Sequence, residues 1–238
     1  MTDIQIQPIK HEDYIPNISR CYVPQGNEAE IVEIHQKNGK NLILEGPHGL
    51  GKTLLFATQA SKNKIPLIQM DCSENTKRHD LIGRFVIIGN DVSYQLGFMP
   101  TAFELANKYG FAVACLEEIN ALNPNMQKVL NQLVDWREHC YIPEMHKTYS
   151  LNPGAKLMIC GTMNPSTYGG TFDLNQDLKS RFLSMKIGFP SETKEMEIVK
   201  SQITISDMSL LKQLETIAIE SRNGISKGTY PQSLCRMQ

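Results

Sequence analysis

The chain has 238 residues, of which 41% are hydrophobic and 21% charged, so it can bury the core of a globular protein. Its net charge is -1 and its densest basic cluster is Lys77-Arg78, which argues against a dedicated nucleic-acid binder. Six scattered cysteines form no C-x-x-C pair, and no apolar run approaches the roughly 18 residues of a membrane span, so we expect a soluble, cytoplasmic protein with reduced thiols and no membrane span.

Five short apolar runs alternate with helical patterns between residues 42 and 187. The runs are apolar on more than one face, as in parallel strands that are covered on both sides. This alternation predicts a doubly wound α/β sheet. The predicted strands are Leu42–Leu44, Ile65–Met70, Phe111–Leu116, Leu157–Cys160 and Ser184–Ile187, and the predicted helices are Lys52–Ser61, Thr101–Tyr109 and Asn125–Trp136.

A glycine-rich loop, Gly46–Thr53 (GPHGLGKT), follows the first strand and precedes the first helix. Its pattern is that of a phosphate-binding loop, the Walker A motif, in which backbone N–H groups and the helix dipole face an anion. Lys52 is expected to reach the β- and γ-phosphates and Thr53 to hold Mg²⁺. An ordinary glycine-rich turn is the alternative. The predicted nucleotide-binding residues here are Gly46, Pro47, His48, Gly49, Leu50, Gly51, Lys52, Thr53 and Leu54.

Two segments interrupt the alternation, and each has the pattern of a β-hairpin. In residues 83–97, two strand-like runs flank the turn-forming tripeptide Gly89-Asn90-Asp91. In residues 140–151, two shorter runs flank Pro143–Lys147. On the residues alone, the two hairpins are as well explained by inert decoration of a core fold as by a functional role.

Two adjacent carboxylates, Glu117 and Glu118, end the third apolar strand. Successive side chains of a strand point to opposite sides, so the two acids lie on different sides of the strand end. In a protein with a phosphate-binding loop, Glu117 would bind magnesium and Glu118 would orient and polarise the attacking water. Acids at a strand end can also simply meet solvent, and the upstream loop is what favours the catalytic interpretation.

Two further polar residues follow in the order that such a site needs. Asn164 ends the fourth strand, at the edge of the sheet where ligands bind in open α/β folds, and is suited to hold a water beside the γ-phosphate. A turn at Asn164-Pro165 is the simpler alternative. Arg181 precedes the last strand and could stabilise charge on a transferring phosphoryl group across a subunit boundary, although a lone arginine is usually solvated.

These stretches resemble the AAA+ ATPases of the MoxR type, and most of all the CbbQ/NirQ/NorQ branch. The resemblance covers about residues 20–190 and includes a segment at Tyr22–Pro24 that packs near the adenine in this family, so Tyr22 joins the predicted nucleotide contacts. The matching stretches are Gly46–Thr53, Asp80–Arg84, Leu116–Asn120, Gly161–Pro165 and Lys179–Phe182.

The resemblance implies a three-layer αβα domain with a parallel sheet in the order 5-1-4-3-2, followed by a small all-α lid. The lid is expected over residues 191–238, where helical patterns occur at Glu192–Lys200 and Met208–Glu220, and the α/β domain over residues 1–190. It also implies ATP and Mg²⁺ as cofactors and a homo-oligomer, a hexameric ring with nucleotide sites between subunits.

The same resemblance implies roles for individual residues and for partners. Asn164 would be the sensor 1 residue, and Arg181 the arginine finger that reaches a neighbour's γ-phosphate. The hairpins would face the pore or a partner. The family works with a partner that carries a von Willebrand factor A domain, and its protein client is typically a metalloenzyme to be remodelled.

The sequence departs from the family pattern at the Walker B position and in the lid. Glu117 occupies the position where Asp is usual, and its extra methylene group moves the carboxylate by about one ångström or more. We therefore expect reduced magnesium affinity and reduced turnover. Gln232 stands where the sensor 2 arginine is expected, and Arg236 lies one helical turn further. The family pattern also places Gln238 inside the last lid helix, as in a shortened lid.

The sequence therefore predicts an ATP-hydrolysing AAA+ motor that remodels a partner protein. Two alternatives stay open. One is a nucleic-acid-linked, restriction-type NTPase, which shares the phosphate-binding loop and the Glu-Glu-Ile-Asn run at residues 117–120. The other is a nucleotide-gated assembly protein of the gas-vesicle type, in which binding matters more than turnover.

Overall fold

A five-stranded parallel sheet forms the centre of the structure. The computed structural model describes residues 5–6, 14–165, 172–202, 213, 216–217 and 219–220. The sheet contains β2 (Leu42–Glu45), β3 (Leu67–Asp71), β6 (Phe111–Glu117), β9 (Lys156–Met163) and β10 (Leu183–Lys186). Its spatial order is β10-β2-β9-β6-β3, and every neighbouring pair is parallel. Numbered along the chain, this is the order 5-1-4-3-2, which confirms the predicted topology.

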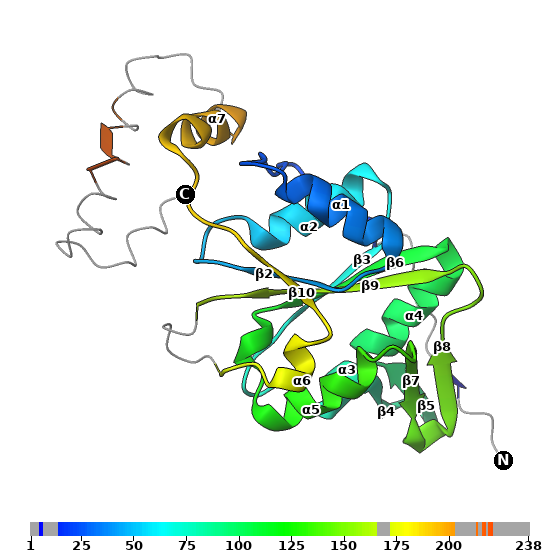
Figure 1. Ribbon diagram of the computed structural model, residues 1–238. Helices are drawn as coiled ribbons and strands as arrows, with labels where there is room; N and C mark the ends of the chain where they lie inside the picture. Colours follow the sequence, from blue (N-terminus) through cyan, green and yellow to red (C-terminus); the bar gives the residue numbers. More distant parts are fainter. Residues whose placement is uncertain are drawn as a thin grey trace.

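Helices cover both faces of the sheet, as Figure 1 shows. One face carries α1 (Glu28–Asn38) and α2 (Lys52–Lys62), and the other carries α3 (Arg78–Ile82), α4 (Phe98–Tyr109), α5 (Pro124–Leu133) and α6 (Gln176–Lys179). Strand β6 supplies both cores in alternation: Val113 and Cys115 pack with α1 and α2, whereas Ala114 and Leu116 pack on the opposite side. Burial on both faces explains why this strand reads as a continuous apolar run.

The two interrupting segments form antiparallel hairpins, as predicted. Strands β4 (Gly83–Ile88) and β5 (Asp91–Leu96) pair with each other, and β1 (Gln5–Ile6) adds to β5 in parallel. Strands β7 (His139–Ile142) and β8 (Lys147–Ser150) flank a short 3-10 helix, η3 (Pro143–Met145). Both hairpins lie on the side of the sheet that carries α4 and α5 (Figure 1).

The boundaries of three elements differ from the predicted ones for local reasons. Helix α4 begins at Phe98, before Pro100, because the first turn of a helix does not need the N–H group that proline lacks. Strand β3 begins only after Pro66. Helix α5 ends at Leu133, and residues 135–138 form a turn in which the Glu138 N–H donates to the Asp135 carbonyl oxygen at 3.1 Å.

Helix α7 (Glu192–Gln202) follows the sheet and agrees with the first predicted lid helix. Most of Met208–Glu220, and all of residues 221–238 with Gln232, Arg236 and Gln238, lie outside the described residues. The division of the chain at residue 190 therefore stays a prediction.

Asn41, just before β2, joins three neighbouring strands at the amino edge of the sheet. Its side-chain amide donates to the Arg181 carbonyl oxygen at 3.3 Å, and its side-chain oxygen accepts from the Ile159 N–H at 3.1 Å. Its own carbonyl oxygen accepts from the Leu183 N–H at 3.1 Å. These bonds fix the start of β10 and the backbone of Arg181.

We expect Asn41→Ala to lower the free energy of unfolding by about 1–3 kcal/mol, because it leaves a partly buried N–H and a carbonyl oxygen without their partner. Urea denaturation followed by circular dichroism measures the change. Asn38→Ala, at an exposed asparagine, is the matched control and is expected to change stability by less than about 0.5 kcal/mol. Equal losses in the two variants would contradict the bridging role of Asn41.

Candidate nucleotide site

The loop Gly46–Thr53 lies at the carboxyl edge of the sheet, between β2 and α2. The Gly46 N–H donates to the Met163 carbonyl oxygen at 3.2 Å, which ties the loop to the end of β9. A Cβ atom at Gly46 would lie 2.3 Å from the Ile187 carbonyl oxygen, so this position requires glycine. Gly51 has a φ of 73°, a left-handed conformation that turns the chain into α2. The loop thus has the strand-loop-helix setting that phosphate binding needs.

Lys52 lies at the centre of the site, and its ammonium group is largely buried. It donates to the carbonyl oxygens of Gly46 and Pro47, at 2.7 Å each, and to the side-chain oxygen of Asn164 at 3.1 Å. Burial lowers the pKa of Lys52 to about 8, and the negative charge of Glu118 opposes that shift. The ammonium group therefore has partners within the loop that a phosphate could replace.

Thr53 and Glu117 meet at the same edge. The Thr53 hydroxyl donates to one Glu117 carboxylate oxygen at 2.7 Å, and the Gln69 amide on β3 donates to the other at 3.1 Å. Glu117 is thus long enough to reach the loop, with Gln69 steering its carboxylate. Sequence reasoning missed Gln69, although as a polar residue in an apolar strand it carried a signal.

Glu118 leaves the line of β6 and points toward the loop. Its φ of 52° is left-handed, which is uncommon for a residue other than glycine, and its N–H donates to the Thr162 hydroxyl oxygen at 3.1 Å. Its side chain is 52% exposed, and one carboxylate oxygen lies 3.7 Å from Nδ1 of His48 in the loop. The bend thus separates the two acids: Glu117 contacts Thr53, and Glu118 stands over the loop in contact with solvent.

Asn164 completes the cluster from the end of β9. The side chain is buried, with its oxygen on Lys52, and its carbonyl oxygen accepts from the Asn120 amide at 3.0 Å. Asn120 lies in the 3-10 helix η2 (Ile119–Ala121), which begins directly after Glu118. Sequence reasoning included Asn120 in the matching stretch Leu116–Asn120 but gave it no role.

The other predicted nucleotide contacts support the loop through packing. Leu50 is buried in the core beneath α2, and the half-buried Leu54 packs against the same core. A Cβ atom on Gly51 would lie 3.2 Å from the Tyr22 ring, so this ring packs directly on the loop. The Tyr22 hydroxyl donates to a Glu28 carboxylate oxygen at 3.0 Å. A contact between Tyr22 and adenine stays a prediction.

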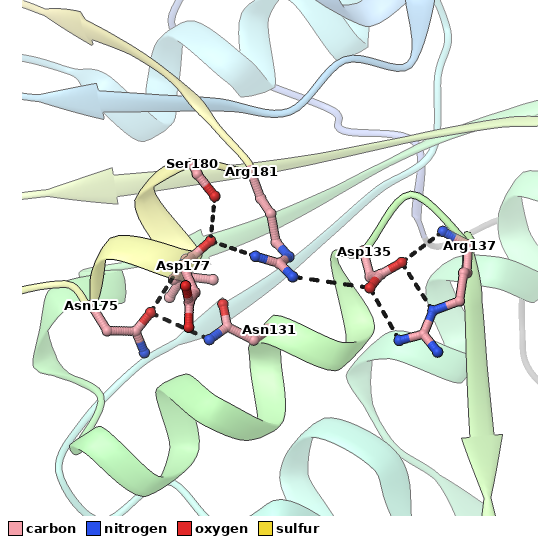
Figure 2. A network of polar contacts seen from close by, with 8 residues as sticks. Asn131, Asp135, Arg137, Asn175, Asp177, Ser180 and Arg181 are labelled. Carbon is pink, nitrogen blue, oxygen red and sulfur yellow. Dashed lines mark hydrogen bonds and ion pairs between the residues drawn. The ribbon is translucent and has the colours of Figure 1, made fainter.

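The structure does not bring Arg181 to this cluster. Its backbone is bonded to Asn41, at the amino end of β2, whereas the loop begins at the carboxyl end of the same strand, about 13 Å away for a strand of this length. The guanidinium group donates to the Asp177 carbonyl oxygen at 2.6 Å and lies 3.9 Å from a carboxylate oxygen of Asp135 (Figure 2). Arg181 therefore points away from its own loop.

The residues present fit a nucleotide phosphate and Mg²⁺. Lys52 offers a positive charge next to the backbone amides of the loop, and its present acceptors are all exchangeable for phosphate oxygens. The Thr53 hydroxyl and the Glu117 carboxylate place two oxygen atoms 2.7 Å apart, and Mg²⁺ prefers oxygen ligands. Among the described residues, no helix is both long enough and apolar enough to cross a membrane.

The sequence is similar to those of known proteins. Residues 41–182 match the family described as AAA domain (dynein-related subfamily). The chain is 28% identical over 210 residues to Protein CbbQ of Hydrogenophilus thermoluteolus, covering 88% of this chain and 76% of that protein. It is 29% identical over 178 residues to Protein NorQ of Paracoccus denitrificans, covering 75% of this chain and 63% of that protein.

A solved structure shares the fold. The crystal structure of a Cytophaga hutchinsonii protein described as an ATPase superposes with a TM-score of 0.58 at 21% identity. The match covers 75% of this chain and 51% of that one, so the chain spans about half the length of this structure and less than two thirds of NorQ. The family match covers more than half of the chain and contains the phosphate-binding loop, both acids and Asn164. The chain belongs to the AAA domain family of the dynein-related subfamily, and within it to the MoxR-type AAA+ ATPases of the CbbQ/NirQ/NorQ branch.

Proposed function

We propose that this chain is the ATP-hydrolysing subunit of a ring-shaped motor that remodels a partner protein. The observation that carries the proposal is the convergence of Lys52, Thr53, Glu117, Glu118 and Asn164 at one edge of the sheet. Such a cluster combines a phosphate cradle, oxygen ligands for Mg²⁺ and a carboxylate that can hold water. In a hexamer, the family's usual ring, each copy would carry one such cluster.

Nucleotide binding would exchange the contacts that now close the site. Lys52 would leave the carbonyl oxygens of Gly46 and Pro47 for phosphate oxygens, and Thr53 and Glu117 would separate to hold Mg²⁺ directly or through its water shell. When bound, Mg²⁺ neutralises charge on the phosphates and orients them. Gln69 would keep the longer Glu117 side chain in place during this exchange.

Hydrolysis would use Glu118 and Asn164 as the groups that position water. Glu118 is exposed and stands over the loop, so its carboxylate can accept a proton from a water that attacks the γ-phosphorus. The new P–O bond forms as the bond to the oxygen bridging the β- and γ-phosphates breaks, and ADP leaves with that oxygen. Asn164 would hold the water in line through the amide that now faces Lys52.

Arg181 would complete the site of a neighbouring copy. Its backbone lies at the amino edge of the sheet, and its guanidinium group contacts Asp177 and Asp135 rather than its own loop. Arg181 would therefore act on the nucleotide of another copy. An arginine supplied in this way stabilises charge on the transferring phosphoryl group. The active species is therefore an oligomer.

The hairpin β4–β5 is our candidate for the contact with a client. It exposes Phe85, Ile87, Ile88 and Val92, an apolar group that solvent alone does not explain. By analogy with the branch, we propose a metalloenzyme client and a partner with a von Willebrand factor A domain, acting in the cytoplasm. A nucleotide-gated assembly protein is the second candidate, favoured by Glu117 at the position where the family pattern has Asp.

Glu118→Gln is expected to retain ATP binding and to lower turnover by about 100-fold to 10,000-fold, because the amide cannot accept the proton. Lys52→Ala is expected to lose ATP binding. Isothermal titration and steady-state phosphate release separate the two effects, and Glu30→Gln, at an exposed position on α1, is the matched control. Unchanged turnover in Glu118→Gln would remove its catalytic role. Negligible turnover in the unmutated oligomer would favour the assembly protein.

ATP affinity is expected to weaken by about tenfold between pH 7 and pH 9, because a lysine with a pKa of about 8 loses most of its charge over this interval while bound phosphates keep it protonated. Fluorescent-nucleotide titration at several pH values measures this change. Because the negative charge of Glu118 raises the pKa of Lys52, Glu118→Gln is expected to move the weakening to lower pH. A constant ATP affinity between pH 7 and pH 9 would contradict the lowered pKa of the buried Lys52.

Mixing two inactive variants is expected to restore activity if Arg181 acts across the interface. Arg181→Ala keeps an intact loop, and Lys52→Ala keeps an intact arginine. In a randomly mixed ring, about a quarter of the interfaces would join the intact loop of one to the intact arginine of the other. Phosphate release from the equimolar mixture, compared with each variant alone, measures the gain. A mixture as inactive as its components would mean that Arg181 does not act in trans.

A further inference from the structure

The turn between α5 and β7 holds its residues rigidly. Besides the bond from the Glu138 N–H to the Asp135 carbonyl oxygen, the Asp135 carboxylate accepts from the Arg137 N–H at 2.9 Å. It also accepts two bonds from the Arg137 guanidinium group, at 3.1 Å each (Figure 2). Trp136 lies between these two residues, so both of its neighbours in the chain are fixed.

Trp136 is 87% exposed, the highest fraction among the large hydrophobic side chains described, and it is the single tryptophan of the chain. Exposing an indole to water forfeits the free energy that its burial would supply. Tryptophan is also the residue most typical of the energetic centre of protein interfaces. A rigid turn that presents it outward lowers the entropic cost of binding.

The position of Trp136 indicates which partner covers it. Asp135, its neighbour, also pairs with Arg181, which must enter the nucleotide site of another copy if it acts at all. Trp136 thus lies in the part of the surface formed by residues 135–137 and Arg181, here called the corner, which would approach a second copy if Arg181 acts in trans. The charges at this corner are mixed, because Asp135, Glu138 and Asp177 lie beside Arg137 and Arg181. The ion pair between Asp135 and Arg181 is therefore what places Trp136 near the contact with another copy.

We propose that Trp136 is the anchor of the contact between copies: its indole is buried by the next copy of this chain, next to that copy's nucleotide site, and Arg181 is delivered from the same corner. This inference rests on the proposed trans role of Arg181. Trp136 supplies the apolar contact, Asp135 holds both arginines in place, and the neighbour's bound nucleotide receives the charge of Arg181.

The single tryptophan allows a direct test with the full chain. Glu118→Gln with ATP and Mg²⁺ is used so that the nucleotide is not consumed. As light scattering reports assembly, tryptophan emission is expected to shift to shorter wavelength and acrylamide quenching to fall. Trp136→Ala is expected to weaken association by about tenfold or more in sedimentation, with an unchanged thermal midpoint. Trp136→Phe is expected to lie between, and Ile87→Ala, an equally exposed apolar side chain on the β4–β5 hairpin, is the matched control.

The outcomes separate this inference from the proposed ATPase function. Arg181→Ala is expected to lose turnover but to retain the shift of tryptophan emission on assembly. If Arg181→Ala instead keeps full turnover and the emission still shifts, the contact through Trp136 is supported and the trans role of Arg181 is rejected. Assembly with unchanged acrylamide quenching would overturn the anchor and leave a different protein as the partner of Trp136. Trp136→Ala that assembles like the unmutated chain, or a chain that stays monomeric with nucleotide, would overturn it as well.

Discussion

The parallel register of three neighbouring strands is the constraint on which the site depends. Strand β9 pairs with β2 on one side, Glu45 opposite Met163, and with β6 on the other, Leu116 opposite Gly161. Because all three run the same way, their carboxyl ends meet at one edge. The loop after β2, the acids after β6 and Asn164 after β9 must then be neighbours. Asn41 fixes the opposite edge, where it ties β10 to β2 and β9.

The contacts within the site also link nucleotide binding to the rest of the sheet. Lys52 joins the loop to β9 through Asn164, and Thr53 joins α2 to β6 and β3 through Glu117 and Gln69. A phosphate that takes Lys52, or a metal ion that parts Thr53 from Glu117, must break these particular bonds. Each exchange alters the ends of strands whose next residues lead into other elements. Under the proposed nucleotide binding, occupancy of the site would therefore be transmitted to these strand ends.

Sequence alone predicted what local patterns record. Strands β2, β6 and β9 are buried on both faces, so their apolar runs are plain. The loop is specified by Gly46, where a Cβ atom would clash, and by Gly51, whose φ is left-handed. Helix α1 was not predicted, because its buried positions 28, 32 and 36 are Glu, Val and Gln, so the apolar residues do not show the helical period. The role of Gln69 could not be predicted because it depends on its tertiary contact with Glu117. The role of Asn120 likewise depends on its contact with Asn164. The end of α5 at Leu133 was likewise decided by the Asp135 turn, whose hydrogen bonds compete with the helix.

The separation of Arg181 from its own loop has a consequence for regulation. Under the proposed trans role of Arg181, a chain with its phosphate-binding loop at one edge of the sheet and this arginine at the other would bind nucleotide alone but would not complete the site alone. Asp135 makes this arrangement stable in the single subunit, because its carboxylate is already satisfied by Arg137 when Arg181 leaves. Releasing Arg181 then costs one weak ion pair at 3.9 Å and one hydrogen bond to the Asp177 carbonyl oxygen. If Arg181 acts in trans, as we propose, hydrolysis is tied to assembly and isolated subunits do not consume ATP.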